Sequence, residues 1–232
     1  MWRVLCDFDG TIATEDVTDS ILTRFAAPEW QAIEAEWKAG RIGSRECMAR
    51  QVALIRATPE DIDEHLESIA LDRHFAGFVE LCRSRGVPVT VVSDGLDYAI
   101  YSLLAREGLA DVPVISNRLD SVGADRYRLE FPNADAGCRS ASGTCKCRSW
   151  DGSDRATQTL LIGDGASDMC AAGAVDLVFA KDSLLDHCRS NGIAHVPCMN
   201  FADAQSLMTA LIEDTAVSAT SFRRSRVAPV KG

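Results

Sequence analysis

Residues 4–11, VLCDFDGT, constrain the fold of this chain more than any other segment. An apolar run, typical of a buried strand, ends abruptly in two carboxylates, a glycine and a hydroxyl. Side chains two apart in a strand point to the same face, so Asp7 and Asp9 are predicted to converge, while Gly10 lets the backbone turn away. A carboxylate pair alone is also typical of a solvated strand end, but the longer string is more specific. Two carboxylates this close repel each other unless a cation or a shared proton lies between them.

The segment that follows, residues 14–73, shows helical periodicity and no strand. The predicted helices cover residues 17–25, 30–37, 44–55 and 58–69. Ser44 is predicted to cap the third helix, and Thr58 with Pro59 to begin the fourth. Because each helix carries an apolar stripe, the four are expected to pack as a small bundle. We therefore expect residues 14–73 to form a helical cap inserted after the first strand.

From residue 74 the pattern alternates between helix and strand. Predicted strands cover residues 87–92, 112–116, 159–162, 176–180 and 195–196, and predicted helices cover 75–85, 96–107, 183–191 and 202–213. Residues 118–122 and 127–131 are interpreted as an antiparallel excursion, and 133–154 as a loop followed by a weakly signalled helix. Buried strands alternating with helices predict an α/β fold with a doubly wound, mostly parallel (Rossmann-like) sheet. Residues 1–13 and 74–214 are expected to form this core, and the basic segment 215–232 a disordered tail.

Three of the predicted strands end in reactive polar residues. They are Asp7 with Asp9, Ser93 with Asp94, and Asp164 with Asp168. In a parallel sheet, ligands bind beyond the carboxyl ends of the strands, so these side chains are predicted to share one crevice. So many carboxylates would repel an anionic substrate, and a divalent cation is needed; Mg²⁺, which prefers oxygen ligands, fits best. Lys146 is the candidate for an additional positive charge, and Lys181 is its rival.

Four segments together resemble the motifs of the haloacid dehalogenase superfamily of phosphotransfer enzymes. They are DFDGT at 7–11, SDG at 93–95, Lys146, and GDGASD at 163–168, in the family's order. The resemblance implies that Asp7 is a nucleophile that forms an aspartyl-phosphate. It also implies that Asp9 protonates the leaving oxygen and then activates water.

The same resemblance implies roles for the remaining motif residues. Mg²⁺ would be held by Asp7, the main-chain carbonyl of Asp9 and Asp164, with Asp168 in support. Ser93 and the Gly95 amide, in the segment that includes Asp94, would bind phosphoryl oxygens, and Lys146 would neutralise them. Each of these residues alone also has an ordinary structural interpretation, as a turn residue, a surface lysine or a helix-start acid.

A helical insertion directly after the first motif resembles the phosphoserine-phosphatase-like branch of the superfamily. Within that branch, residues 40–47 (GRIGSREC) and 145–147 (CKC) look most like phosphatases of the 2-hydroxy-3-keto-5-methylthiopentenyl-1-phosphate type, although Arg148 stands where that group is expected to have a proline. Asp16, beside Glu15, is a candidate substrate-binding acid or a helix-start carboxylate. Arg45 is a candidate for an anionic group or a salt bridge within the cap.

Composition limits the partners and the redox state. The net charge of −10 argues against nucleic-acid and anionic-membrane partners, and no apolar run is long enough to span a bilayer. With no basic-then-apolar leader visible, we expect a cytoplasmic protein whose nine cysteines are reduced. The spacing of Cys138, Cys145 and Cys147, with no histidine nearby, disfavours zinc and favours a loop-shaping or redox-sensitive role.

The leading functional hypothesis is a Mg²⁺-dependent phosphatase acting on a small phosphorylated metabolite. One alternative keeps the reaction and changes the substrate to phosphoserine, phosphoethanolamine or phosphocholine. Another transfers the phosphoryl group to an acceptor other than water, as a mutase or phosphotransferase does. A third is a regulator that binds a phosphometabolite without catalysis, although retention of both Asp7 and Asp9 argues against it. The sequence leaves the oligomeric state open.

Overall fold

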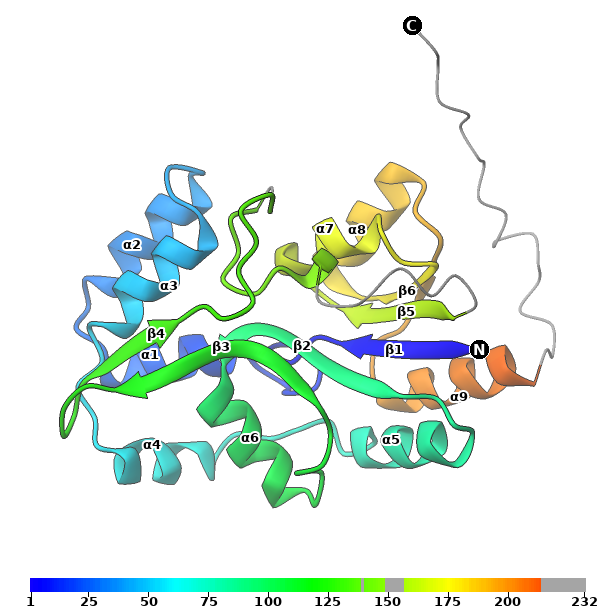
Figure 1. The fold of residues 1–232 in the computed structure, drawn as a ribbon, viewed down its shortest axis with the longest axis horizontal. Helices are drawn as coiled ribbons and strands as arrows, with labels where there is room; N and C mark the ends of the chain where they lie inside the picture. Colours follow the sequence, from blue (N-terminus) through cyan, green and yellow to red (C-terminus); the bar gives the residue numbers. More distant parts are fainter. Residues whose placement is uncertain (139, 149–156, 214–232) are drawn as a thin grey trace, which may run out of the picture.

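The computed structural model describes residues 1–138, 140–148 and 157–213. These residues contain a seven-stranded sheet of order β4-β3-β2-β1-β5-β6-β7 (Figure 1). The strands are β1 (Trp2–Cys6), β2 (Val89–Leu96), β3 (Val114–Ser121), β4 (Tyr127–Glu130), β5 (Gln158–Gly163), β6 (Leu177–Ala180) and β7 (His195–Pro197). All neighbours pair in parallel except β3 and β4. The predicted α/β fold with a doubly wound, mostly parallel sheet is confirmed.

Helices cover both faces of the sheet. They are α1 (Val17–Phe25), α2 (Trp30–Lys38), α3 (Ser44–Val52), α4 (Pro59–Leu66), α5 (Phe75–Ser84), α6 (Asp97–Arg106), α7 (Met169–Ala172), α8 (Asp182–Asn191) and α9 (Phe201–Ile212). Figure 1 shows α5, α6 and α9 on one side of the sheet and α7 and α8 on the other. Alternation along β1 explains this arrangement, because Val4 and Cys6 enter one apolar cluster and Leu5 enters the other.

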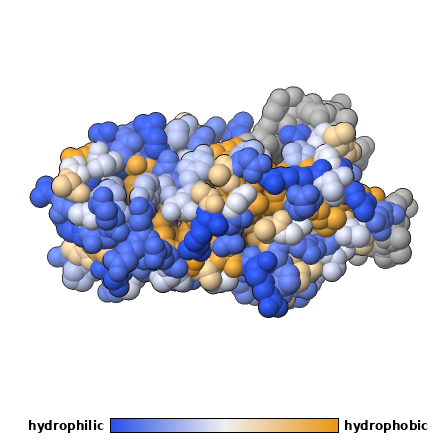
Figure 2. Space-filling model, turned by 90° about the horizontal axis from the view of Figure 1, so that it is seen from below, coloured by the Kyte–Doolittle hydropathy of each residue, from blue (hydrophilic) through white to orange (hydrophobic). Residues whose placement is uncertain are grey.

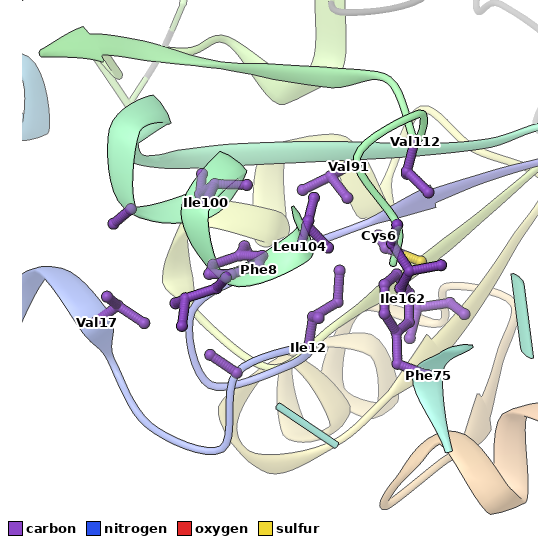
Figure 3. Close-up of a cluster of buried hydrophobic side chains, with 14 of the residues drawn as sticks. Cys6, Phe8, Ile12, Val17, Phe75, Val91, Ile100, Leu104, Val112 and Ile162 are labelled. Carbon is purple, nitrogen blue, oxygen red and sulfur yellow. The ribbon is translucent and has the colours of Figure 1, made fainter. Parts of the chain in front are cut away.

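The larger of the two clusters extends from the sheet into the inserted helices. Cys6, Val91 and Ile162 from the central strands lie in the same cluster as Phe8 and Val17 (Figure 3). The cluster continues through α4, which also contacts α6: the Tyr98 hydroxyl donates to Asp63 at 2.7 Å. The inserted helices and the sheet therefore share one apolar core, while the boundary of a cap at residues 14–73 stays a prediction.

Three details of the predicted insertion differ from the structure. Gly43 is the N-cap of α3 and Ser44 is its first residue; the Ser44 hydroxyl bonds to Asp94 instead of capping the helix. Helix α3 ends at Val52, before Ile55, and α4 ends at Leu66. At Thr58 the prediction is confirmed, because its side chain accepts from the Asp61 amide in a capping box.

The region after β2 also differs from its predicted outline. The segments expected as separate strands, 112–116 and 118–122, form the single strand β3, which turns back into the antiparallel β4. Most of residues 133–145 form a loop, followed by a short 3₁₀ helix, Lys146–Arg148. The predicted helix near residue 154 and the basic tail lie outside the described residues.

The face of the molecule on the side of α4, α5 and α6 is mainly hydrophilic (Figure 2). Viewed from the side of α4, α5 and α6, charged and polar residues dominate and hydrophobic residues show mostly toward the middle (Figure 2). Every helix in residues 1–138, 140–148 and 157–213 is too short or too polar to span a bilayer.

Candidate active site

The carboxyl ends of β1, β2 and β5 place the predicted site residues together. Asp7 directly follows β1, and its amide donates to the Ile162 carbonyl on β5 at 2.9 Å. Phe8, between Asp7 and Asp9, is fully buried in the apolar core. Because alternate side chains point in opposite directions, this burial directs the two flanking acids away from the core. At Gly10 the backbone turns with φ of +68°, and a Cβ there would lie 2.8 Å from an Asp164 carboxylate oxygen. Glycine is therefore required at this close approach.

Lys146 is buried between two carboxylates. Its Nζ lies 2.6 Å from Asp7 Oδ1 and 2.8 Å from Asp168 Oδ1, and it also donates to Ser167 Oγ at 2.9 Å. Burial alone would lower the pKa of Lys146, but Asp168 and Asp7 outweigh it and raise the pKa. The rival Lys181 lies instead at the start of α8, beside a separate small pocket. The structure thus brings Lys146, and not Lys181, into contact with Asp7.

One cluster in the described residues offers carboxylate ligands for a metal ion. Asp7, Asp164 and Asp168 each present an oxygen atom within 4.8 Å of the others. Thr11 Oγ1 donates to Asp164 at 2.9 Å and orients it. Burial and then Asp168 raise the pKa of Asp7 against the opposing effect of Lys146. Three carboxylates with one lysine leave excess negative charge, and a hard divalent cation fits both this charge and these oxygen donors.

Asp168 holds other residues of the cluster in position. It is fully buried, and its second oxygen accepts the amides of Asp164 and Gly165 at 3.3 Å each. These bonds hold the turn after β5, while the first oxygen holds Lys146. Asp168 therefore fixes the positions of both the lysine and the neighbouring acid.

Asp9 and Ser93 form the second half of the predicted site. Asp9 accepts the Val17 amide at 2.8 Å, so the start of α1 positions its side chain. Ser93 Oγ lies 3.4 Å from the other Asp9 oxygen and accepts the Gly95 amide at 2.9 Å. Burial, and secondarily Asp16, raises the pKa of Asp9 to about 7. A protonated Asp9 near neutral pH is what a general acid requires.

Asp94 has its carboxylate occupied by protein donors. Ser44 Oγ lies 2.5 Å away, Asn117 Nδ2 3.0 Å and the Thr144 amide 2.8 Å. It therefore connects α3 to β2, β3 and the loop before Lys146. Sequence reasoning missed the fully buried Asn117, for which the only signal was a polar residue within an apolar strand.

A cavity of about 210 Å³ lies above these strand ends. Its core wall is formed by Asp7, Asp9, Ser93, Asp94, Gly95 and residues 164–167. Its cap wall is formed by Asp16, Thr18, Asp19, Glu34, Trp37, Ser44, Cys47, Met48 and Gln51 from the start of α1 and from α2 and α3. Among the described residues no lysine or arginine is on this lining, so the cavity is acidic with an apolar patch.

The predicted cap residues differ in placement. Asp16 is the N-cap of α1, as expected of a helix-start carboxylate, and it also lines the cavity; its role in substrate binding stays a prediction. Arg45 is exposed on α3 and is not part of the lining. Sequence reasoning missed Glu34 and Gln51, which bond to each other at 3.0 Å across α2 and α3. Gln51 is a polar residue buried in the helical bundle, and a buried amide needs a hydrogen-bond partner there. This requirement is the signal that points to the pair.

The fold and the strand-end carboxylates agree with a match to a family model. The model of haloacid dehalogenase-like hydrolases matches residues 4–173, and the chain belongs to this family. A curated relative, 2-hydroxy-3-keto-5-methylthiopentenyl-1-phosphate phosphatase of Geobacillus kaustophilus, is 33% identical over 206 residues, which are 86% of this chain and 92% of the relative. The enzyme of the same name from an Exiguobacterium strain is also 33% identical, over 89% of this chain and 96% of the relative.

Solved structures show the same fold at lower identity. A substrate-bound phosphoserine phosphatase superposes with a TM-score of 0.63 and 21% identity, over 88% of this chain and 97% of that chain. A HAD family hydrolase from Salmonella enterica serovar Typhi gives a TM-score of 0.65 and 18% identity, over 93% and 72% of the two chains. These structures agree with the architecture that the four motifs predicted.

Proposed function

We propose that this chain is a Mg²⁺-dependent phosphatase that hydrolyses a small phosphomonoester through an aspartyl-phosphate on Asp7. The observation that carries the proposal is the buried Asp7 carboxylate at the end of β1, with Lys146 Nζ at 2.6 Å and a protonatable Asp9 beside it. A binding protein has no need of a proton donor at this position. The small metabolite, a cytoplasmic location and the absence of nucleic-acid and membrane partners belong to the same proposal.

The residues divide the reaction between them. The Asp7 carboxylate attacks phosphorus while Asp9 protonates the leaving oxygen; Asp9 then takes a proton from the water that cleaves the aspartyl-phosphate. Ser93 Oγ, only weakly held by Asp9 at 3.4 Å, is available to a phosphoryl oxygen, and Lys146 keeps Asp7 in place. Asp7, Asp164, Asp168 and the Asp9 carbonyl would hold Mg²⁺, which when bound supplies charge neutralisation as a Lewis acid.

As substrate we propose 2-hydroxy-3-keto-5-methylthiopentenyl-1-phosphate, the compound in the names of the relatives. Trp37, Cys47 and Met48 give the cap wall an apolar patch that suits an uncharged thioether tail. Phosphoserine fits less well, because its carboxylate would enter a cavity whose described lining holds acids and no cation.

The acids of the cap wall favour a second candidate substrate class. Asp16, Asp19 and Glu34 line the cavity, and the positive charge of an ester such as phosphoethanolamine or phosphocholine would partly offset theirs. Trp37 could contact a quaternary ammonium group through its ring face. The reaction and the core residues are the same for both candidates.

One experiment tests the reaction and the substrate together. We would measure phosphate release from a panel of phosphometabolites, with Mg²⁺ or EDTA, for wild type, Asp7→Asn, Asp9→Asn and the surface control Asp111→Asn. We expect metal-dependent release, highest for the methylthiopentenyl phosphate, that only the first two substitutions abolish. Undiminished turnover by Asp7→Asn would disprove the nucleophile, and highest release from phosphoethanolamine or phosphocholine would establish the second class. Phosphate binding without turnover on any compound would favour the regulatory alternative.

A further inference from the structure

A row of thiols adjoins the buried lysine of the site. Cys145 Sγ and Cys147 Sγ lie 3.3 Å apart, on the residues immediately before and after Lys146. Cys138 extends the row as a hydrogen-bond partner of Cys145, and Cys170, on α7, as a partner of Cys147. Sequence spacing placed only the first three near one another; the fold adds Cys170.

The arrangement favours chemistry between two thiols over a tetrahedral metal site. In the described residues, a cluster of metal ligands within 4.8 Å of one another occurs among the acids and not among the sulfur atoms. The thiols therefore form a row of neighbouring pairs, whereas four ligands of one zinc ion must all lie close together. Cys147 is half-buried and open to a small oxidant, while Cys145 is 1% exposed.

We propose that Cys145 and Cys147 form an oxidisable dithiol whose disulfide displaces Lys146 and switches off the active site. A bond would shorten the sulfur separation from 3.3 Å to about 2.05 Å and close a ring through the Lys146 backbone. This backbone is a single 3₁₀ turn, closed by the Arg148 amide on the Cys145 carbonyl at 3.0 Å. Because Lys146 Nζ is held within 2.9 Å by three side-chain partners, a shift of the turn breaks contacts with Asp7 and Asp168.

The oxidant is a hydroperoxide, and the steps balance. The Cys147 sulfur attacks the peroxide, forming an S–O bond as the O–O bond breaks, and the thiol proton leaves with the released alcohol. The Cys145 sulfur then attacks Cys147, forming the S–S bond as the S–O bond breaks, and the Cys145 proton leaves in water. Two thiols have lost two electrons, and the hydroperoxide has become alcohol and water. A thiol reductant restores both cysteines by disulfide exchange.

Peptide mapping tests the bond directly, because trypsin separates the three nearby cysteines. Cleavage after Arg139, Lys146 and Arg148 leaves Cys138, Cys145 and Cys147 on different peptides. After treatment with tert-butyl hydroperoxide and blocking of free thiols, we expect a peptide of residues 140–146 linked to Cys147-Arg148. No such link, or a link from Cys138 to Cys145 in its place, would overturn the proposal.

Its effect on the site is measured in two ways. Oxidation should lower hydrolysis of p-nitrophenyl phosphate at least tenfold and lower the Tm, both reversed by dithiothreitol. Cys147→Ser should resist both changes, and the matched control Cys170→Ser should remain sensitive. Equal loss of activity and Tm in Cys147→Ser would overturn the proposal.

The activity measurement rests on the proposed function, whereas the peptide map and the Tm do not. A reduced wild type that hydrolyses no phosphomonoester would count against the phosphatase alone. In that case the linked peptide and the reversible fall in Tm would still establish the dithiol, and their absence would refute it.

Discussion

The two walls of the cavity differ in how their charges are held. On the core wall, acids at three strand ends are fixed by the sheet, by Thr11 and by a buried lysine at 2.6 Å. On the cap wall, acids from α1 and α2 stand among apolar side chains on short helices, and no lysine or arginine of the described residues joins them on the lining. Under the proposed function, the core wall would bind one charged group in one geometry, and the cap wall would select what is attached to it.

Lys146→Met should give the largest effect, because it removes the buried cation that contacts Asp7 and Asp168 behind the core wall. Asp7 and Asp168 would lose a buried partner, which costs about 3–5 kcal/mol of stability. We also expect a fall in kcat of about 10²–10³-fold, since in the proposed reaction the lysine would orient the nucleophile Asp7 and offset phosphoryl charge. Urea unfolding and steady-state kinetics check both effects, with Lys181→Met as the control. Equal losses in the two variants would mean that Lys146 has no special place in the site.

The core wall was predictable from sequence, whereas the cap wall apart from Asp16 was not, for a physical reason. Parallel strands bring their carboxyl ends to one edge, so polar residues after apolar runs suffice to assemble Asp7, Ser93 and Asp164. Lys146 is harder, because its loop has no periodicity, and only its match to a motif distinguished it from Lys181. Its partner Asp168 follows from the last motif.

The cap wall depends on how α2 and α3 lie over the sheet, which local patterns do not encode. Ser44 illustrates this: its sequence context favours a helix cap, yet its hydroxyl bonds to Asp94, 50 residues away. Trp37 and Met48 have the spacing of ordinary core residues, and only the assembled structure shows that they line the cavity. The positions of these residues are therefore determined by tertiary contacts and not by local sequence patterns.

Trp37→Ala tests the cap wall alone. The side chain forms part of the apolar patch, so kcat/KM for the methylthiopentenyl phosphate should fall about 10–100-fold, mostly through KM. Hydrolysis of p-nitrophenyl phosphate should retain its kcat. Trp30→Ala is the matched control: it lies on the same helix but packs against the core, so it should lower Tm and leave KM unchanged. A collapse of kcat on every substrate in Trp37→Ala would show that the two walls are not separable.

The acids of both walls predict how pH changes stability. Burial is the largest cause raising the pKa of Asp9 to about 7 and of Asp19 to about 6, and it also raises the pKa of Asp7 and Asp164. The folded chain then binds more protons than the unfolded chain between about pH 4 and 7, so stability falls as pH rises through this window. We expect the metal-free Tm to be about 3–6 °C lower near pH 8 than near pH 5.

Mg²⁺ should restore the stability that is lost at high pH through the acids of the core wall, and not the stability lost through the acids of the cap wall. Thermal melts near pH 5 and pH 8, with Mg²⁺ or EDTA, should show a larger metal-induced rise in Tm at the higher pH, where the carboxylates are ionised. Asp164→Asn should abolish most of the rise, and Asp19→Asn, on the cap wall, should leave it intact. A metal effect that is equal at both pH values would contradict the assignment of these acids as ligands.

Ser44→Ala should give the smallest effect, because it loosens one contact between the walls and leaves the other lining residues unchanged. It removes a hydrogen bond of 2.5 Å to the Asp94 carboxylate, worth about 1–2 kcal/mol, and leaves Asn117 and Thr144 as donors to that acid. We expect a fall in Tm of about 2–6 °C and a two- to threefold rise in KM, roughly what a slightly displaced α3 would cause, with kcat unchanged. Ser84→Ala, whose hydroxyl bonds within its own helix, is the control in the same thermal and kinetic measurements. If kcat fell as much as KM rose, the core wall would depend on the cap for its own geometry, and chemistry and selection would not be divided between the two walls.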